Sequence, residues 1–282
     1  MPKMVDKIQK IGYKYFMEYN YKENQDKILN HLSQYKKNVL KIKKNGIYSK
    51  NLKEYTHILP KDKEIHNLIV SDYFMDLWNI IKVYKINLHK YFHHLNSSQA
   101  MCFNLFYPII KENLLEIIMK NTNDDIIGWK FEYEPDKIER TNFDVFIQTQ
   151  KLGYYFELKF TEQNFGSKIM NERSIQRYNE VYKEKMQIFK KVTPEIFYKN
   201  YQIFRNLSYI DKGIINFVFP KTRIDLDMEI NTILEKHCDK KYLEKINIVY
   251  IEDILERALL INKFKEHYKI FSEKYIEWAY CA

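Results

Sequence analysis

Cysteine, glycine and proline are scarce in this chain, and their scarcity excludes several kinds of site. The 282 residues contain three widely spaced cysteines, six glycines and six prolines. The cysteines lack the closely spaced pairs of a zinc site, and an odd number gives no disulfide framework. The two closest glycines are Gly153 and Gly166, so neither a P-loop, a dinucleotide-binding loop nor a serine elbow can be written. We therefore expect no nucleotide cofactor.

Long hydrophobic runs are absent as well. No uncharged apolar stretch approaches the roughly 18 residues that span a bilayer, and no charged and then apolar leader opens the sequence. With 45% hydrophobic and 16% aromatic residues, the composition is that of a folded protein. We expect a cytoplasmic protein without a membrane partner.

Positive charge is present in excess, and it is concentrated near the N-terminus. The formal net charge is +9, and residues 1–60 hold 13 lysines against 5 acidic residues. Such a basic flank is typical of proteins that bind a polyanion, most commonly nucleic acid. Lysine, asparagine, isoleucine and tyrosine are all abundant, however, and a compositional bias of the source genome explains the charge equally well.

Two regions differ in their pattern of apolar residues. Residues 1–95 carry apolar side chains every three or four positions, which predicts helices only. Ser97 or Ser98 is expected to cap a helix through 100–106, and Pro108 to begin another through 109–120. Strands are then expected at 129–134, 142–149, 154–160, 214–220 and 246–251, and helices at 172–191, 194–209, 226–237 and the C-terminal end. This order predicts a mixed α/β domain with helices on the faces of its sheet.

Charged residues interrupt two of these strands, in the segment "FDVFIQTQKLGYYFELKF" (143–160). Glu157 and Lys159 share one face of their strand because alternate residues of a strand point the same way. A turn centred on Gln150 and Lys151 would place Asp144 directly opposite Glu157, with Cβ atoms about 5 Å apart. Two carboxylates this close repel each other, and a divalent cation such as Mg²⁺ is the usual remedy.

The pattern resembles a known superfamily. Asp144 followed by "ELK" (157–159) is similar to the D…(D/E)xK signature of the PD-(D/E)xK nucleases, which include many restriction endonucleases. The resemblance implies an αβββαβ core, and Mg²⁺, replaceable by Mn²⁺, bound by Asp144, Glu157 and the main-chain carbonyl of Leu158. It also implies a catalytic role for Lys159. Asn142 and Phe143, not proline, precede the aspartate, and that proline is dispensable in the superfamily.

A narrower likeness covers about residues 92–260. The segments "HLNSSQAMCFNLF", "RTNFDVFI" and "ELKFTEQNFG" look like parts of a group of restriction-endonuclease-like proteins within that superfamily. Several further polar residues become candidates for auxiliary or DNA-binding roles, although helix capping, buried amide bonds or solvation explain most of them equally well. They are Ser98, Gln99, Asn104, Glu112, Glu162, Gln202 and Arg205. Glu112 and Glu116 are the candidates for an extra acidic residue from the first helix of the core.

The sequence therefore predicts a Mg²⁺-dependent DNA endonuclease, of the restriction type, that cuts double-stranded DNA by attack of an activated water. Residues 96–282 would form the nuclease domain, and the helical region 1–95 would help to hold the duplex. A homodimer would suit a palindromic site, but no interface stripe identifies one. Two alternatives stay open: a repair, recombination or mobile-element nuclease of the same fold, and a nucleic-acid-binding protein in which the charged hairpin is structural.

Overall fold

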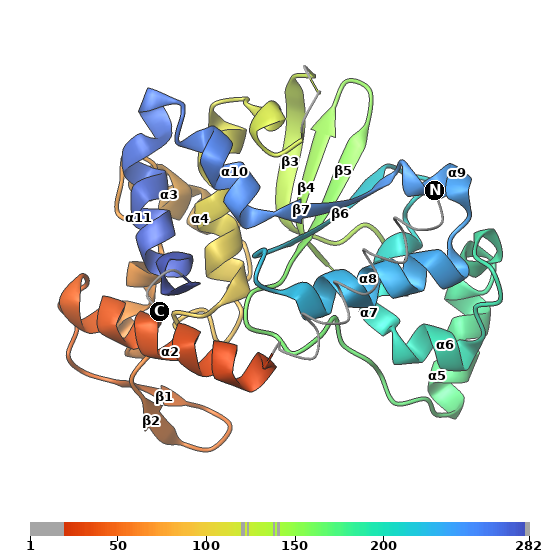
Figure 1. Cartoon of the computed structure of the whole chain (residues 1–282), viewed down its shortest axis with the longest axis horizontal. Coiled ribbons are helices and arrows are strands. Elements are labelled where there is room, and N and C mark those ends of the chain that lie inside the picture. The colour runs from red at the N-terminus through yellow and green to blue at the C-terminus, as the bar shows by residue number, and fades with distance from the viewer. Residues whose placement is uncertain (1–19, 120–121, 123, 138, 140–141, 280–282) are drawn as a thin grey trace, which may run out of the picture.

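A five-stranded mixed sheet lies at the centre of the computed structural model, which describes residues 20–119, 122, 124–137, 139 and 142–279 (Figure 1). The strands, in their spatial order, are β3 (Ile126–Tyr133), β4 (Phe143–Thr149), β5 (Gly153–Leu158), β6 (Ile214–Phe219) and β7 (Ile246–Tyr250). The pairs β3–β4 and β4–β5 are antiparallel, whereas β5–β6 and β6–β7 are parallel. The predicted mixed α/β class is confirmed, and each predicted strand range overlaps an observed strand.

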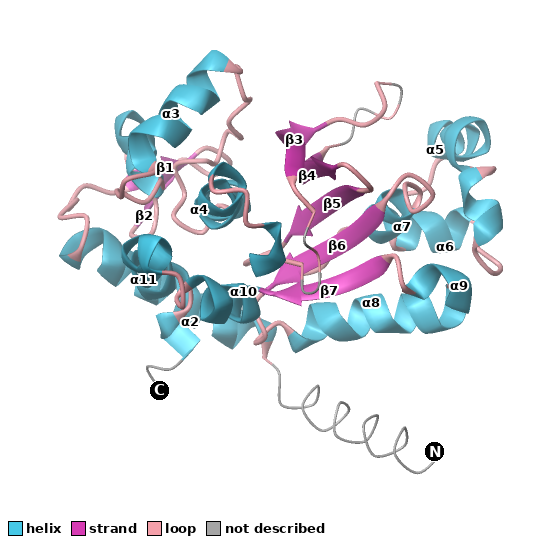
Figure 2. Ribbon diagram, turned by 90° about the horizontal axis from the view of Figure 1, so that it is seen from above, coloured by secondary structure: helices cyan, strands magenta, loops and turns pink. Residues whose placement is uncertain are grey.

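Helices cover both faces of this sheet (Figure 2). On one side lie α2 (Tyr21–Asn38), α3 (Phe74–Val83), α4 (Ser98–Lys111), α10 (Ile251–Ala258) and α11 (Lys265–Tyr275). On the other side lie α5 (Glu172–Arg177), α6 (Pro194–Lys199), α7 (Tyr201–Leu207), α8 (Ile224–His237) and α9 (Lys240–Leu243). The order α4, β3, β4, β5, α7, β6 is compatible with the core of a restriction-endonuclease-like fold.

The alternation of side chains along β4 divides the core in two. Val145 and Ile147 belong to the hydrophobic cluster on the α4 side, whereas Phe146 packs against the cluster on the α7 and α8 side. β5 alternates in the same way, with Phe156 facing α4 and Tyr155 facing the other side. The alternation breaks at the start of β4, because Phe143 also belongs to the cluster on the α7 and α8 side.

The structure corrects the predicted start of a helix at Pro108. α4 begins after Ser97, whose hydroxyl accepts from the backbone N–H of Ala100 at 3.3 Å, and it continues through Pro108 to Lys111. A proline inside a helix leaves the carbonyl four residues earlier without its usual donor. Here Nε2 of the buried His267 donates to the carbonyl of Asn104 at 2.7 Å. This contact from α11 replaces the missing bond, so the helix does not break.

The prediction that the N-terminal region consists of helices only is wrong, because this region also contains a β-hairpin. β1 (Gly46–Tyr48) pairs antiparallel with β2 (Lys53–Tyr55). Gly46 permits this packing, since a Cβ atom there would lie 2.0 Å from the carbonyl oxygen of Leu59. The helical pattern predicted up to residue 95 is also longer than the observed helix, because α3 ends at Val83.

The hydrophobic core crosses the predicted domain boundary at residue 95. Ile28 and Leu32 of α2 lie in the same cluster as Phe106 of α4 and Phe271 of α11. The division into two domains stays a prediction. In the part of the chain that the structure describes, no helix has both the length and the apolar character needed to cross a bilayer.

Candidate active site

The hairpin of β4 and β5 has the predicted register. Val145 pairs with Phe156, and Phe146 with Tyr155, so the same alignment carries Asp144 to the position opposite Glu157. Oδ2 of Asp144 accepts from the backbone N–H of Leu158 at 2.6 Å. The aspartate is thereby fixed against the end of β5, beside the backbone of the residue that follows the glutamate.

Glu132 on β3 extends this arrangement to a third strand. Phe131 pairs with Val145, and Tyr133 with Phe143, so Glu132 stands beside Asp144. Its backbone adopts a φ of 50°, a left-handed conformation that is strained for a residue with a side chain and that often marks functional sites. The sequence analysis did not single out this residue.

Two amides hold the Glu132 carboxylate. Nε2 of Gln99, at the N-terminal end of α4, donates to its Oε1 at 2.8 Å. Nδ2 of Asn142, just before β4, donates to its Oε2 at 3.4 Å. Three neighbouring strands therefore each contribute one carboxylate to a single row: Glu132, Asp144 and Glu157.

Glu157 lies at the buried end of the row, where α7 supplies most of its partners. Oε2 accepts from Nη2 of Arg205 at 3.1 Å and from Nδ2 of Asn206 at 3.2 Å. Oε1 accepts from Nζ of Lys159 at 3.0 Å and from Nε2 of Gln202. The three α7 residues are spaced by three and four positions and so share one face of that helix. Gln202 and Arg205 were predicted as candidates, whereas Asn206 was not.

Lys159 sits where β5 ends, and the chain just beyond it is firmly held. Its ammonium group pairs with Glu157 and lies 5.9 Å from the centre of the Phe165 ring. The Glu162 carboxylate accepts from the backbone N–H of Phe160 at 2.8 Å. Arg223 donates to the carbonyls of Phe160 and Glu162 at 2.7 and 2.6 Å. Glu162, another predicted candidate, therefore stabilises the turn that follows the lysine.

Burial and the crowding of charges shift the pKa values of Asp144, Glu132 and Lys159. Burial, followed by repulsion from Glu157 and Glu132, raises the pKa of Asp144 well above its usual range. Burial and Glu157 also raise the pKa of Glu132, although its two amide partners oppose the shift. For Lys159, burial alone would lower the pKa, but Glu157, Glu162 and Asp144 outweigh it and the net pKa is raised. The site is an anionic cluster that a cation would stabilise.

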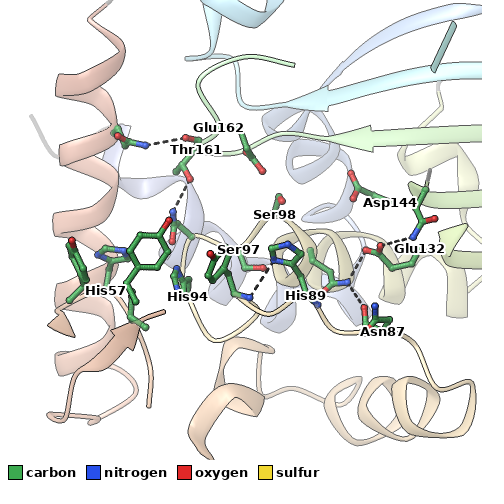
Figure 3. A pocket seen from close by; sticks show the side chains of 18 residues that line it. His57, Asn87, His89, His94, Ser97, Ser98, Glu132, Asp144, Thr161 and Glu162 are labelled. Atoms are coloured by element: carbon green, nitrogen blue, oxygen red, sulfur yellow. Dashed lines mark hydrogen bonds between the residues drawn. The ribbon is translucent and has the colours of Figure 1, made fainter. Parts of the chain in front are cut away.

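A cavity of about 720 Å³ opens beside this cluster (Figure 3). Asp144 and Glu132 face it from the sheet, and Ser98 and Glu162 also line it. The lining does not include Glu157 and Lys159, which are 3% and 8% exposed. Of the three predicted catalytic residues, Asp144 therefore lines the cavity, whereas Glu157 and Lys159 do not.

A comparison with protein families gives this site its context. The family described as restriction endonuclease associating with ARP matches residues 29–276. The chain belongs to this family. No curated protein and no solved structure shows significant similarity. The family match supports the general prediction of a restriction-endonuclease-like nuclease. It begins at residue 29, whereas the likeness seen in the sequence begins at about residue 92.

Not every predicted residue of this restriction endonuclease family member joins the site. Ser98 and Gln99 line the cavity. Asn104 is buried elsewhere, where it accepts from the backbone N–H of Ile69 at 2.9 Å and donates to Tyr275 at 3.1 Å. Glu112, beyond the far end of α4, pairs with Lys263. The structure brings neither Asn104 nor Glu112 to the carboxylate row.

The same site offers a limited set of side-chain ligands for a metal. Within the described ranges, no three histidine, cysteine, aspartate or glutamate side chains converge closely enough to hold an ion. Hard cations such as Mg²⁺ need fewer, because they keep several waters and take main-chain oxygens. Two carboxylates and the backbone of Leu158, which already lies against Asp144, would suit such an ion.

Proposed function

We propose that this chain is a Mg²⁺-dependent DNA endonuclease of the PD-(D/E)xK type that cuts double-stranded DNA. Asp144, Glu157 and the main-chain carbonyl of Leu158 would hold the ion, and Lys159 would act beside it. Glu132 would take the place of the extra acidic residue expected from the first helix. The observation that carries the proposal is the row of carboxylates on three adjacent strands, next to a buried lysine, in a restriction endonuclease family.

The residues present fit a divalent cation. Burial, and then repulsion from Glu157 and Glu132, raises the pKa of Asp144, and a divalent ion between the carboxylates would relieve that repulsion. Both oxygens of Glu157 already have partners, Oε2 in Arg205 and Asn206 and Oε1 in Lys159 and Gln202, so a bond to the ion would replace one of these contacts. Mn²⁺ has similar ligand preferences and should substitute. When bound, the ion would lower the pKa of a water and offset charge on the phosphate.

The protein's own groups would position the reaction. The carboxylates around Lys159 raise its pKa, so at neutral pH the side chain is an ammonium that donates protons in hydrogen bonds. Such a cation can orient the attacking water and stabilise the charge that develops on the phosphate. Arg205 pairs with Glu157 at 3.1 Å and orients its carboxylate. No nucleophilic side chain is required, so hydrolysis would proceed in one displacement without a covalent intermediate.

Cleavage of supercoiled plasmid DNA tests this function. The wild-type chain should cut in Mg²⁺ and not in EDTA, and Lys159→Ala should lower the rate by about 10²- to 10³-fold, the usual cost of removing one electrostatic group at a transition state. Lys151→Ala is the matched control, because Lys151 lies in the turn of the same hairpin with its side chain 75% exposed. A fully active Lys159→Ala variant would refute the assignment.

The products of the same assay separate the kinds of nuclease. Discrete fragments would show recognition of a sequence, as expected of a restriction enzyme. A smear, or a need for free ends, would instead indicate a repair or recombination nuclease. A protein that binds DNA but cleaves none under any metal condition would be a binding protein with a structural hairpin.

A further inference from the structure

The cavity beside the carboxylates has a second end, built from aromatic rings. Figure 3 shows His57 and His94 far along the cavity from Asp144 and Glu132. We call this end the aromatic wall, formed by Tyr48, Tyr55, His57, Tyr91 and His94. Tyr48 and Tyr55 come from the β1–β2 hairpin, the element that the sequence pattern did not predict.

The rings of the aromatic wall contact one another and form a continuous surface. The ring centres of Tyr91 and His94 are 4.9 Å apart, and those of Tyr48 and Tyr91 are 5.3 Å apart. Tyr55 extends the surface to His57 at 5.8 Å. Aromatic surfaces of this kind bind flat rings by stacking, and every nucleobase has such a face.

Several buried polar atoms in and beside these rings lack hydrogen-bond partners in the described part of the chain, including the hydroxyl of Tyr91. Nε2 of His94 and Oδ1 of Asn96 make no hydrogen bond within the protein, and both residues line the cavity. His94 is 8% exposed, so its unsatisfied nitrogen carries a desolvation cost that a ligand could repay. The amide nitrogen of Asn96 is held by Thr161 at 2.9 Å, which leaves the carbonyl oxygen to accept from a ligand.

The charge of the aromatic wall favours a neutral ligand. Burial lowers the pKa of His57 to about 4 and that of His94 to about 3, so both are uncharged at neutral pH and offer little attraction to a phosphate.

Lysine ammonium groups lie over the rings: Lys90 is 4.7 Å from the ring centre of Tyr91, and Lys50 is 6.0 Å from that of Tyr48. They could pair with the phosphates on either side of a bound base.

We propose that the aromatic wall binds a single nucleobase turned out of its stack, close to the phosphate that water would attack beside the carboxylate row. The inference rests on the proposed nuclease function and specifies how its substrate is read. Gln99 connects the two ends: it binds Glu132, and its Oε1 accepts from the backbone N–H of His89 at 2.8 Å. The ring centre of His89 lies 5.2 Å from that of Tyr91. Chemistry on extruded or single-stranded nucleotides commonly uses such pockets, where rings stack on the base and polar atoms read its edge.

Binding of free deoxynucleoside 5′-monophosphates tests this pocket without any cleavage. The four monophosphates, and deoxyribose 5-phosphate as the probe without a base, are titrated in EDTA and followed by saturation-transfer difference NMR. We expect saturation of the base protons of at least one nucleotide, and about tenfold weaker binding to Tyr91→Ala, the loss expected for one stacked ring. Tyr84→Ala is the control, because Tyr84 is 70% exposed and is not part of the cavity lining.

The outcomes are separable from those of the nuclease test. Equal binding of the sugar phosphate and the nucleotides, or unchanged binding to Tyr91→Ala, would overturn the base pocket even if plasmid cleavage depends on Lys159. Base binding without any cleavage would instead contradict only the nuclease assignment. Tyr55→Ala, on the partly exposed hairpin, repeats the measurement should Tyr91→Ala fail to fold.

Discussion

Replacing Glu132 with glutamine should make the protein more stable and less active. Glu132 stands beside Asp144 in the carboxylate row, and the raised pKa values of both groups show that ionising them opposes folding. Like charges on neighbouring strands repel by a few kcal/mol at an effective dielectric constant of about 20. Partial protonation reduces this cost, so we expect Glu132→Gln to gain about 1–2 kcal/mol of unfolding free energy at pH 8.

The sign of the pH dependence follows from the same shifts. A carboxyl group whose folded pKa is raised contributes stability below its ordinary pKa, and that contribution is lost as the pH rises through the folded value. The advantage of Glu132→Gln should therefore be large at pH 8 and small near pH 4, where the wild-type carboxyl groups are protonated. Mg²⁺ should reduce it too, because the ion would stabilise the wild-type row more than the variant.

Urea unfolding in EDTA at the two pH values measures the stability, and plasmid cleavage in Mg²⁺ measures the activity. Cleavage by Glu132→Gln should fall about 10- to 100-fold, the range typical of groups that support a metal ligand. Glu134→Gln, an exposed position two residues along the chain, should change neither quantity. A Glu132→Gln variant no more stable than the wild type at pH 8 would refute the reasoning about the row.

Three further predictions concern the framework around the site. Arg205→Ala should cost about 3–5 kcal/mol in urea unfolding, because it leaves Glu157 buried with less compensating charge; a loss below about 1 kcal/mol would contradict this account. Burial lowers the pKa of His267 to about 4, so stability should decrease by up to about 3 kcal/mol as the pH falls from 6.5 toward 4, and His267→Gln should show a shallower decrease. Gly213→Ala should cost roughly 1–3 kcal/mol by thermal or urea unfolding, because its Cβ would lie 2.2 Å from a main-chain oxygen of β5. Gly128→Ala, whose nearest contact would be 3.8 Å, is the control.

The parts of the site that local geometry fixes could be predicted from the sequence. The short turn between β4 and β5 sets their register, so the partner of Asp144 could be found by counting residues. The spacing of Gln202 and Arg205 along α7 likewise placed both on one face. Asn206 lies on that face as well, one position further, and the spacing could have identified it.

The parts that depend on distant contacts could not be predicted. Glu132 lies on β3, whose alignment with β4 depends on a longer connection than a tight turn, and nothing in "WKFEYE" distinguishes it from an ordinary surface glutamate. The β1–β2 hairpin has strands of three residues each, too short for an alternating pattern. The persistence of α4 through Pro108 depends on His267, which comes from α11, far along the chain.

The central claim is that the carboxylate row binds a divalent cation. Titration of Mn²⁺ into the protein, with free Mn²⁺ followed by electron paramagnetic resonance, measures this directly and requires no DNA. The account predicts saturable uptake by the wild type, a loss of affinity of at least about tenfold in Asp144→Asn, and no change in Asp211→Asn at an exposed position. No uptake by the wild type, or equal uptake by Asp144→Asn, would contradict it.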